Sequence, residues 1–366
     1  MAPLTQQQAE RRLATVRKAM TDEKLDAVLL VEAANVRWLS GYAGEGASLM
    51  VTRRWAGILV GFRNVARAAE QTVGCVVLNA TRRPHAWREE IRRRRIRTIG
   101  LESRLTHAAF QQRRKALRPA RVRATDLVRR CRAVKDPAEI ALLRRAQRDV
   151  EKVLDRLLGE LRPGLTEHQV HNRIIQMILD DPALDGPSFP PICASGPSAW
   201  ATHSYYTERR IRRNDCVILD LGVRRGGYCS DMTRTVFLGR PTRAMREVYG
   251  VVWEAQQRAI EAIRPGAAPA DVHQAAHQVL EAHGYSKSMG HGLGHGIGLE
   301  VHEQPTLGRA AKGRKARPLE AGMLVTVEPG IYLEGRFGVR IEDTVLVTPR
   351  GCENLTRADK SLTVLG

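Results

Sequence analysis

The feature of this 366-residue chain that most constrains its fold is an internal repeat in its second half. Residues 162–171 read RPGLTEHQVH, and residues 264–273, 102 positions later, read RPGAAPADVH. Each copy follows an amphipathic stretch, residues 138–161 and residues 242–263, that has the 3.6-residue period of a helix. Each copy also opens another helix, the first of which Thr166 can cap. We therefore expect two related halves within one domain.

The first copy is followed by a predicted β-hairpin that carries two carboxylates. Its sequence is CVILDLGVRRGGYCSDMTRTVFL, residues 216–238. A turn centred on Arg225 and Gly226 would place Asp220 directly opposite Asp231. Opposed carboxylates destabilise a hairpin unless a shared proton or a cation neutralises them.

The second copy is followed by a hairpin with the same conflict. Its sequence is MLVTVEPGIYLEGRFGVRIEDTVLV, residues 323–347. A turn centred on Gly335 would place Glu328 opposite Glu342. Two matched pairs of acids in two related hairpins favour a cation site over ordinary surface residues.

A third segment supplies imidazoles. HGLGHGIGLEVHE, residues 291–303, holds three of the eleven histidines of the chain. Four carboxylates and an imidazole have enough charge for two divalent metal ions, which in such sites lie roughly 3.5–4 Å apart and can share a water or hydroxide. From the residues alone, any of His291, His295 and His302 could be the ligand. The histidines on helical segments are expected to be structural: His168, His171, His273 and His277.

The first third of the chain reads as an α/β domain. Short apolar runs of strand type occupy residues 25–33, 57–62, 73–80 and 95–103, and the stretches between them have a helical pattern. Strand and helix alternation of this kind is typical of α/β folds.

Charge separates this region from the rest. The net charge is +20, and residues 1–135 hold 29 Lys and Arg against 11 Asp and Glu, or +18. Residues 136–366 hold 30 against 28, or +2. This shift, with the helix-like AVKDPAEIALLRRAQ that starts at residue 133, predicts an N-terminal domain of residues 1–133 and a second domain of residues 134–366.

The basic run at residues 92–95 raises the hypothesis of nucleic-acid binding. No aromatic interleaving or nucleic-acid motif accompanies the charge, so we interpret REEIRRRRIR as the end of an amphipathic helix with a solvated basic face. An arginine-rich proteome would account for the excess.

The sequence gives no sign of export or membrane insertion. Six cysteines without CxxC pairing suit a reducing compartment, and the polar N-terminus has no apolar core of a signal peptide. We expect a soluble, cytoplasmic protein.

The motifs of both regions resemble those of the pita-bread metallopeptidases, specifically the Xaa-Pro group of prolidase and aminopeptidase P. The resemblance covers essentially the whole chain and rests on NVRWLSGY, AVKDPAEIALLRRA, DLGVRRGGYCSDMTRT, GHGIGLEVHE, TVEPGIY and GVRIEDTVLV. It implies a creatinase-like α/β N-terminal domain and an α+β pita-bread catalytic domain with an internal pseudo-twofold repeat.

The resemblance also implies a ligand set and a reaction. The metal ligands would be Asp220, Asp231, His295, Glu328 and Glu342. This oxygen-dominated set suits two manganese ions, although zinc, cobalt or iron could occupy it. The implied activity is hydrolysis of the Xaa-Pro bond, in peptides with proline at the second position, through a metal-bridging hydroxide. The family's common arrangement is a homodimer.

The resemblance assigns further residues to catalysis and substrate binding. Glu328 would carry the proton from water to the leaving nitrogen. His302 and His203, in ASGPSAWATHSYYT, would stabilise the oxyanion or hold the substrate carbonyl, and His291 would also line the cleft. Arg340 would orient acidic ligands or substrate by forked hydrogen bonds.

Departures from the family pattern concern specificity. Ser198 stands where Asn is common and Thr202 where Pro is common, and the N-terminal domain reads GFRNVARAAEQ in place of an acidic stretch. Two alternatives are an inactive pita-bread protein that binds nucleic acid or acidic partners through its basic domain, and another enzyme of this fold, of creatinase or methionine aminopeptidase type. All five ligand positions are filled, which disfavours an inactive protein and an enzyme of creatinase type. Methionine aminopeptidases usually have no comparable N-terminal domain, so they also fit less well. Dipeptidase and aminopeptidase activity stay equally open.

Overall fold

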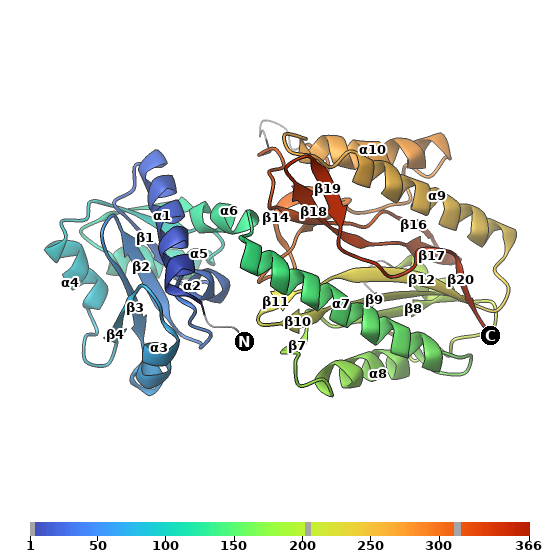
Figure 1. Ribbon diagram of the computed structural model, residues 1–366, viewed down its shortest axis with the longest axis horizontal. Helices are drawn as coiled ribbons and strands as arrows, with labels where there is room; N and C mark the ends of the chain where they lie inside the picture. Colours follow the sequence, from blue (N-terminus) through green and yellow to red (C-terminus); the bar gives the residue numbers. More distant parts are fainter. Residues whose placement is uncertain (1–3, 202–205, 311–315) are drawn as a thin grey trace. The chain divides into compact units, whose positions relative to one another are not determined.

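The computed structural model describes residues 4–201, 206–310 and 316–366. The chain divides into two compact units, Met1–Arg132 and Ala133–Gly366. Figure 1 shows both with their elements labelled. Within the described residues, no helix has the length and apolar character needed to cross a membrane.

The first unit is a six-stranded sheet with helices, in the strand order β4-β3-β2-β1-β5-β6. β1 runs parallel to β5 and antiparallel to β2. The strands are β1 (Ala27–Leu30), β2 (Ser48–Thr52), β3 (Ala56–Val60), β4 (Val76–Asn79), β5 (Thr98–Glu102) and β6 (Arg121–Thr125). The helices are α1 (Gln6–Asp22), α2 (Ala33–Ser40), α3 (Val65–Gln71), α4 (Ala86–Arg93), α5 (His107–Ala116) and α6 (Leu127–Ala133), with a short 3₁₀ turn at Phe62–Asn64.

The four predicted apolar runs of this unit overlap strands β1, β3, β4 and β5, so the α/β prediction is confirmed. The prediction omitted β2 and β6. β6 is an edge strand with the sequence RVRAT and no buried residue, so it lacks the apolar signal on which the prediction depended.

The basic run closes α4, as expected. Glu90, which is buried, accepts hydrogen bonds from Arg93 Nη2 at 2.5 Å and from Arg94 Nε at 2.9 Å. Part of the charge of this run is therefore paired within the unit.

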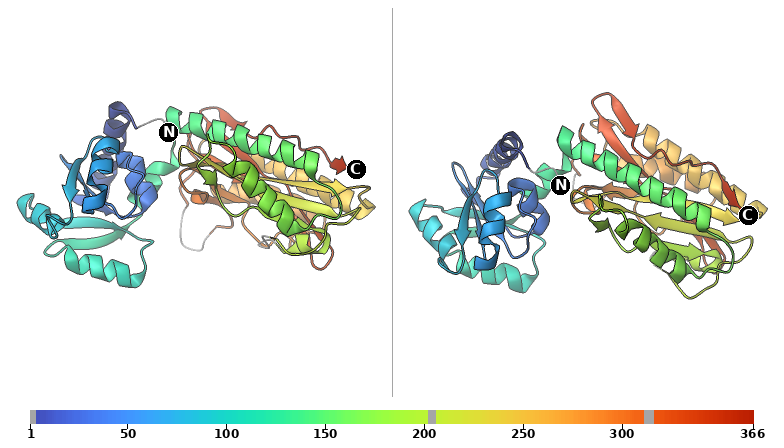
Figure 2. Two further views of the ribbon diagram at one scale, coloured as in Figure 1. Left: turned by 90° about the horizontal axis from the view of Figure 1, so that it is seen from below. Right: turned by 60° about the horizontal axis from the view of Figure 1, so that its bottom comes forward.

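The second unit has two helix pairs, α7 (Pro137–Glu160) with α8 (Glu167–Leu179), and α9 (Arg243–Glu261) with α10 (Pro269–Ala282). Each RPG sequence of the repeat connects the two helices of a pair, which confirms the expected relation between the halves. Thr166 caps α8 and accepts a hydrogen bond from the Gln169 backbone N–H. Figures 1 and 2 show strands lying between the two helix pairs.

The strands of this unit form several small sheets, the two largest in the orders β20-β12-β9-β8 and β14-β13-β15-β18-β19. Shorter ladders join β16 to β17 and β11-β10-β7. The strands are β7 (Gly186–Pro187), β8 (Ile192–Ser195), β9 (Cys216–Leu221), β10 (Val223–Arg225), β11 (Tyr228–Cys229), β12 (Met232–Leu238), β13 (Gly294–Gly296), β14 (Glu303–Leu307), β15 (Leu324–Val327), β16 (Gly330–Leu333), β17 (Phe337–Arg340), β18 (Asp343–Thr348), β19 (Gly351–Asn354) and β20 (Thr363–Leu365), with a 3₁₀ turn at Gly196–Trp200. Apolar side chains of α7 and α8 pack with those of β9 and β12 in one core, and those of α9 and α10 pack in another.

The register of the first hairpin differs from the predicted one by two residues. Asp220 pairs with Thr233, not with Asp231. The turn lies at Gly226 and Gly227, with φ values of 57° and 85°, because a two-residue hairpin turn of this type needs positive φ at both positions. The predicted turn would have put Arg225 in that strained conformation. A shift of two residues preserves the face of a strand, so both aspartates still lie on the same side.

The register of the second hairpin is confirmed. Gly330 pairs with Arg340 in the outer ladder, and Val327 pairs with Asp343 in the inner one. Glu328 and Glu342 lie between these two paired segments, at matching positions. The turn contains Gly335 at φ 66°, as expected.

Candidate metal centre

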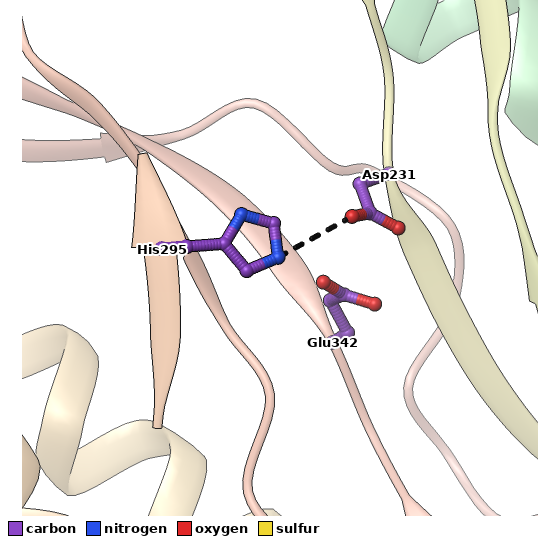
Figure 3. A group of neighbouring side chains, drawn as sticks. All are labelled: Asp231, His295 and Glu342. Carbon is purple, nitrogen blue, oxygen red and sulfur yellow. Dashed lines mark ion pairs between the residues drawn. The ribbon is translucent and has the colours of Figure 1, made fainter. Parts of the chain in front are cut away.

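Strands of both halves bring three predicted ligands together. Asp231 precedes β12, His295 lies in β13 and Glu342 precedes β18. One potential ligand atom from each of these three side chains lies within 4.8 Å of the other two. Figure 3 shows the three side chains pointing toward one another from separate strands.

The other two predicted ligands adjoin this group. His295 Nε2 lies 3.7 Å from Asp231 Oδ2 and 3.5 Å from Glu328 Oε1. Asp220 is in β9, and electrostatic interactions reach from it to Asp231 and to Glu342. All five predicted ligand positions therefore contribute to one buried, acidic cluster.

Two carboxylate oxygens of the cluster have no hydrogen-bond donor among the described residues. One oxygen of Asp220 accepts from Arg340 Nη2 at 2.6 Å, while Oδ1 is buried without a partner. One oxygen of Glu342 accepts from Thr233 Oγ1 at 2.8 Å, while Oε1 is likewise buried without a partner. A buried anion left unpaired is strongly unfavourable, so these oxygens fit the coordination of a cation.

Burial and mutual repulsion perturb the protonation of the cluster. Burial raises the pKa of Glu328 to about 8, with a further contribution from Asp220. Burial, followed by repulsion from neighbouring carboxylates, raises the pKa values of Asp231 and Glu342 well above their usual range. Burial, followed by repulsion from His302, lowers the pKa of His295 to about 4, so its imidazole is neutral and its lone pair is available to a metal.

These shifts predict how the stability of the metal-free protein depends on pH. The pKa of Glu328 is higher in the folded state than its ordinary value of 4.5. Its contribution to the free energy of unfolding is therefore fully present below pH 4.5 and is lost as pH rises through about 8. We expect the free energy of unfolding to fall by roughly 2 kcal/mol between pH 6.5 and pH 8.5 from this group alone. The lowered pKa of His295 reduces the free energy of unfolding only below pH 6.5, so it does not affect this comparison.

Thermal unfolding of the protein stripped of metal, at pH 6.5 and at pH 8.5, measures this effect. Glu328→Gln should remove much of the difference, and loading with manganese should suppress it. An equal loss of stability in the Glu328→Gln variant would assign the pH dependence to other groups.

Glycines beside His295 allow the close packing of β13. A Cβ at Gly294 would lie 2.1 Å from the Thr326 carbonyl oxygen, and one at Gly296 would lie 2.2 Å from the Gln304 carbonyl oxygen. The backbone of β13 therefore approaches its neighbours closely at both glycines, and neither glycine has positive φ. The Thr326 hydroxyl also accepts a hydrogen bond from the His295 backbone N–H at 3.1 Å.

Arg340 is buried and links the cluster to its surroundings. Besides Asp220, it donates from Nε to Thr233 Oγ1 and from Nη1 to Tyr332 OH, both at 3.0 Å. Its donors thus go to three different residues and do not form a fork on one carboxylate. The sequence reasoning missed Thr233 and Tyr332; both lie inside the motifs that carry the ligands, two residues after Asp231 and four residues after Glu328.

The predicted substrate-binding histidines have different positions. The exposed ring of His302 packs edge-on against that of His295, with 4.3 Å between centroids. His291 Nε2 lies 2.9 Å from Tyr332 OH. His203 and Thr202 lie outside the described residues.

Comparison with protein families gives two matches. The model of "Metallopeptidase family M24" matches residues 141–349. The model of "Creatinase/Prolidase N-terminal domain" matches residues 12–134.

Individual proteins match along almost the full length. A Xaa-Pro dipeptidase of Pyrococcus horikoshii is 30% identical over 345 residues, which cover 94% of this chain and 96% of that protein. The solved structure of a Xaa-Pro dipeptidase from Bacillus anthracis has a TM-score of 0.91 and 32% identity, and covers 98% of this chain and 100% of its own. The solved structure of an X-Pro aminopeptidase from Thermotoga maritima has a TM-score of 0.84 and 29% identity, and the match covers 95% of this chain and 100% of that chain.

Proposed function

Because the chain belongs to the M24 metallopeptidases, with a creatinase/prolidase N-terminal domain before the catalytic domain, we propose that it hydrolyses Xaa-Pro peptide bonds with two divalent metal ions. The predicted fold class, an α/β creatinase-like domain followed by an α+β pita-bread domain, is confirmed. The catalytic role falls to the proposed domain of residues 134–366. The observation that carries the proposal is the convergence of Asp231, His295 and Glu342 beside two unpaired buried carboxylate oxygens.

The five clustered side chains would hold the metal. They are Asp220, Asp231, His295, Glu328 and Glu342. When bound, divalent ions supply Lewis-acid activation of water and of the scissile carbonyl. Four carboxylates and one imidazole form a hard ligand set, which favours manganese, with zinc, cobalt and iron as further candidates.

The side chains of the site would divide the remaining work. Glu328 would accept a proton from water and pass it to the proline nitrogen. Burial and the neighbouring Asp220 raise its pKa in the metal-free protein, and bound cations would favour its ionised form. His302 lies beside His295, where its imidazole could donate a hydrogen bond to the oxyanion. We propose the same role for His203. Arg340 positions Asp220, and hydrogen bonds through Tyr332 link it to His291.

A peptide whose second residue is proline has no N–H at the scissile bond, so the cleft must recognise the ring. Relatives named as dipeptidase and as aminopeptidase both match, so the proposal is the Xaa-Pro class.

We also propose a homodimer, because this is the common arrangement in the family that the chain resembles. Cysteines without disulfide bonds suit a cytoplasmic location. Retention of all five ligand positions argues against an inactive protein that binds nucleic acid or acidic partners.

A substrate panel tests this function. The protein is stripped of metal, reconstituted with manganese and assayed on Ala-Pro, Ala-Pro-Ala and Ala-Ala-Ala. We expect metal-dependent cleavage of the two proline peptides only, and their ratio defines the subtype. Cleavage of Ala-Ala-Ala at a similar rate would contradict proline specificity, and binding of manganese without hydrolysis of any proline peptide would overturn the proposed substrate.

A further inference from the structure

A second group of cationic and imidazole side chains surrounds a cavity beside α10. The cavity has a volume of about 470 Å³ and is lined by His273 and His277 of α10, by Lys287 and His291 of the following loop, and by Arg309. Among the described residues that line it, none is acidic. α10 packs along α9 in this half of the catalytic unit (Figure 1).

His273 is the unusual member of this group. Its side chain is buried, with 4% of the residue exposed, and neither ring nitrogen has a hydrogen-bond partner in the described part of the chain. The equivalent histidine of the first half, His171, is also buried but its Nδ1 lies 2.7 Å from the Pro191 carbonyl oxygen. Buried polar groups are nearly always paired, so the unpaired ring of His273 indicates a missing partner in the cavity.

We propose that this cavity binds a small oxyanion, of carboxylate or phosphate type. Imidazole N–H groups of His273 and His277 can donate to such an anion, and Nε2 of His277 is also buried without a partner in the described structure. Lys287 and Arg309 are exposed at the rim and have no carboxylate partner among the described residues. Burial, then repulsion from His277 and Arg309, lowers the pKa of His273. The electrostatic potential of this region is therefore positive, which favours an anion over a metal cation.

The cavity is connected to the metal centre by hydrogen bonds. His291 lines the cavity and contacts Tyr332 OH at 2.9 Å, and Tyr332 OH in turn accepts from Arg340, which holds Asp220 at 2.6 Å. Two sources can supply the oxyanion: an inorganic ion, or the C-terminal carboxylate of a short peptide. The second source rests on the proposed peptidase function, whereas the anion site itself does not.

Binding of inorganic phosphate to the full-length protein tests the site. Metal is removed with a chelator, which is then dialysed away, so that phosphate cannot bind to metal. Calorimetric titration should show saturable binding that weakens at least tenfold in the Lys287→Gln/Arg309→Gln double variant. The Arg240→Gln/Arg350→Gln variant is the matched control, because it removes the same charge from exposed positions that do not line the cavity.

Imidazole NMR shifts give a second readout that does not depend on a substitution at the buried position. The resonances of His273 and His277 should move with phosphate concentration, while those of His168 and His171 stay unchanged. Absence of saturable binding, equal weakening in the control variant, or unchanged His273 signals would overturn the proposal.

Competition identifies the source. Ala-Pro and its C-terminal amide are each added to the phosphate complex of the metal-free protein. Displacement by the free acid alone assigns the site to the peptide carboxylate, and displacement by neither assigns it to an inorganic ion. Phosphate binding in a protein that hydrolyses no proline peptide would leave the anion site intact and reject only the proposed function.

Discussion

Asp231→Asn is expected to abolish metal-dependent hydrolysis, with kcat/KM lowered by roughly 10³-fold or more, because an amide replaces a charged ligand at the centre of the cluster. The same change should stabilise the metal-free protein. Burial and repulsion by Glu342, Asp220 and Glu328 raise the pKa of Asp231, so its ionisation opposes folding at pH 8, and a neutral amide at this position should stabilise the metal-free fold. Opposite effects on activity and on stability are the signature of a cation site built from repelling acids.

Kinetics with manganese and thermal unfolding without metal measure the two effects. Asp155→Asn is the matched control, because Asp155 is exposed on α7 and should alter neither quantity. Retention of more than about a tenth of the activity in Asp231→Asn would exclude Asp231 as an essential ligand. A metal-free variant less stable than the wild type would contradict the repulsion argument.

Arg340→Met is expected to lower both activity and stability. Arg340 is buried and supplies the hydrogen bond to one oxygen of Asp220, and its loss leaves that carboxylate buried and unpaired. Breaking a buried ion pair on one side costs about 3–5 kcal/mol. Displacement of Asp220 should also lower kcat/KM by roughly 10²-fold, a size typical of residues that orient a metal ligand.

Urea unfolding without metal and kinetics with manganese measure this pair of effects. Arg336→Met on the same hairpin is the control, because Arg336 is exposed. Bound manganese should recover part of the lost stability, since it neutralises the carboxylate that Arg340 no longer holds. Activity within about threefold of the wild type would show that the position of Asp220 does not depend on Arg340.

Much of the local structure follows from short-range chemistry. The start of α8 depends on Thr166, whose hydroxyl accepts from a backbone N–H three residues later, and the second hairpin depends on the turn at Gly335. Both features involve residues close in the chain, so their pattern is visible without a fold. The first hairpin shows where such reasoning fails: two adjacent glycines, Gly226 and Gly227, left more than one turn open, and the prediction chose the wrong one.

Local residue patterns were enough to predict the two helix pairs, the alternation of strands and helices in the N-terminal unit and the face on which each pair of carboxylates lies. Those patterns left three histidines as candidate ligands, and the choice of His295 came from the family resemblance; its physical reason lies in the tertiary structure. His291, His295 and His302 are alike in local context, and the packing of β13 against β14 and β15 places His295 beside Asp231. The tertiary structure also brings Arg340 of β17 to Asp220 of β9, although the two residues are 120 positions apart in the chain. Long-range contacts of this kind depend on the packing of whole strands against one another. A local residue pattern does not predict which strands pack together.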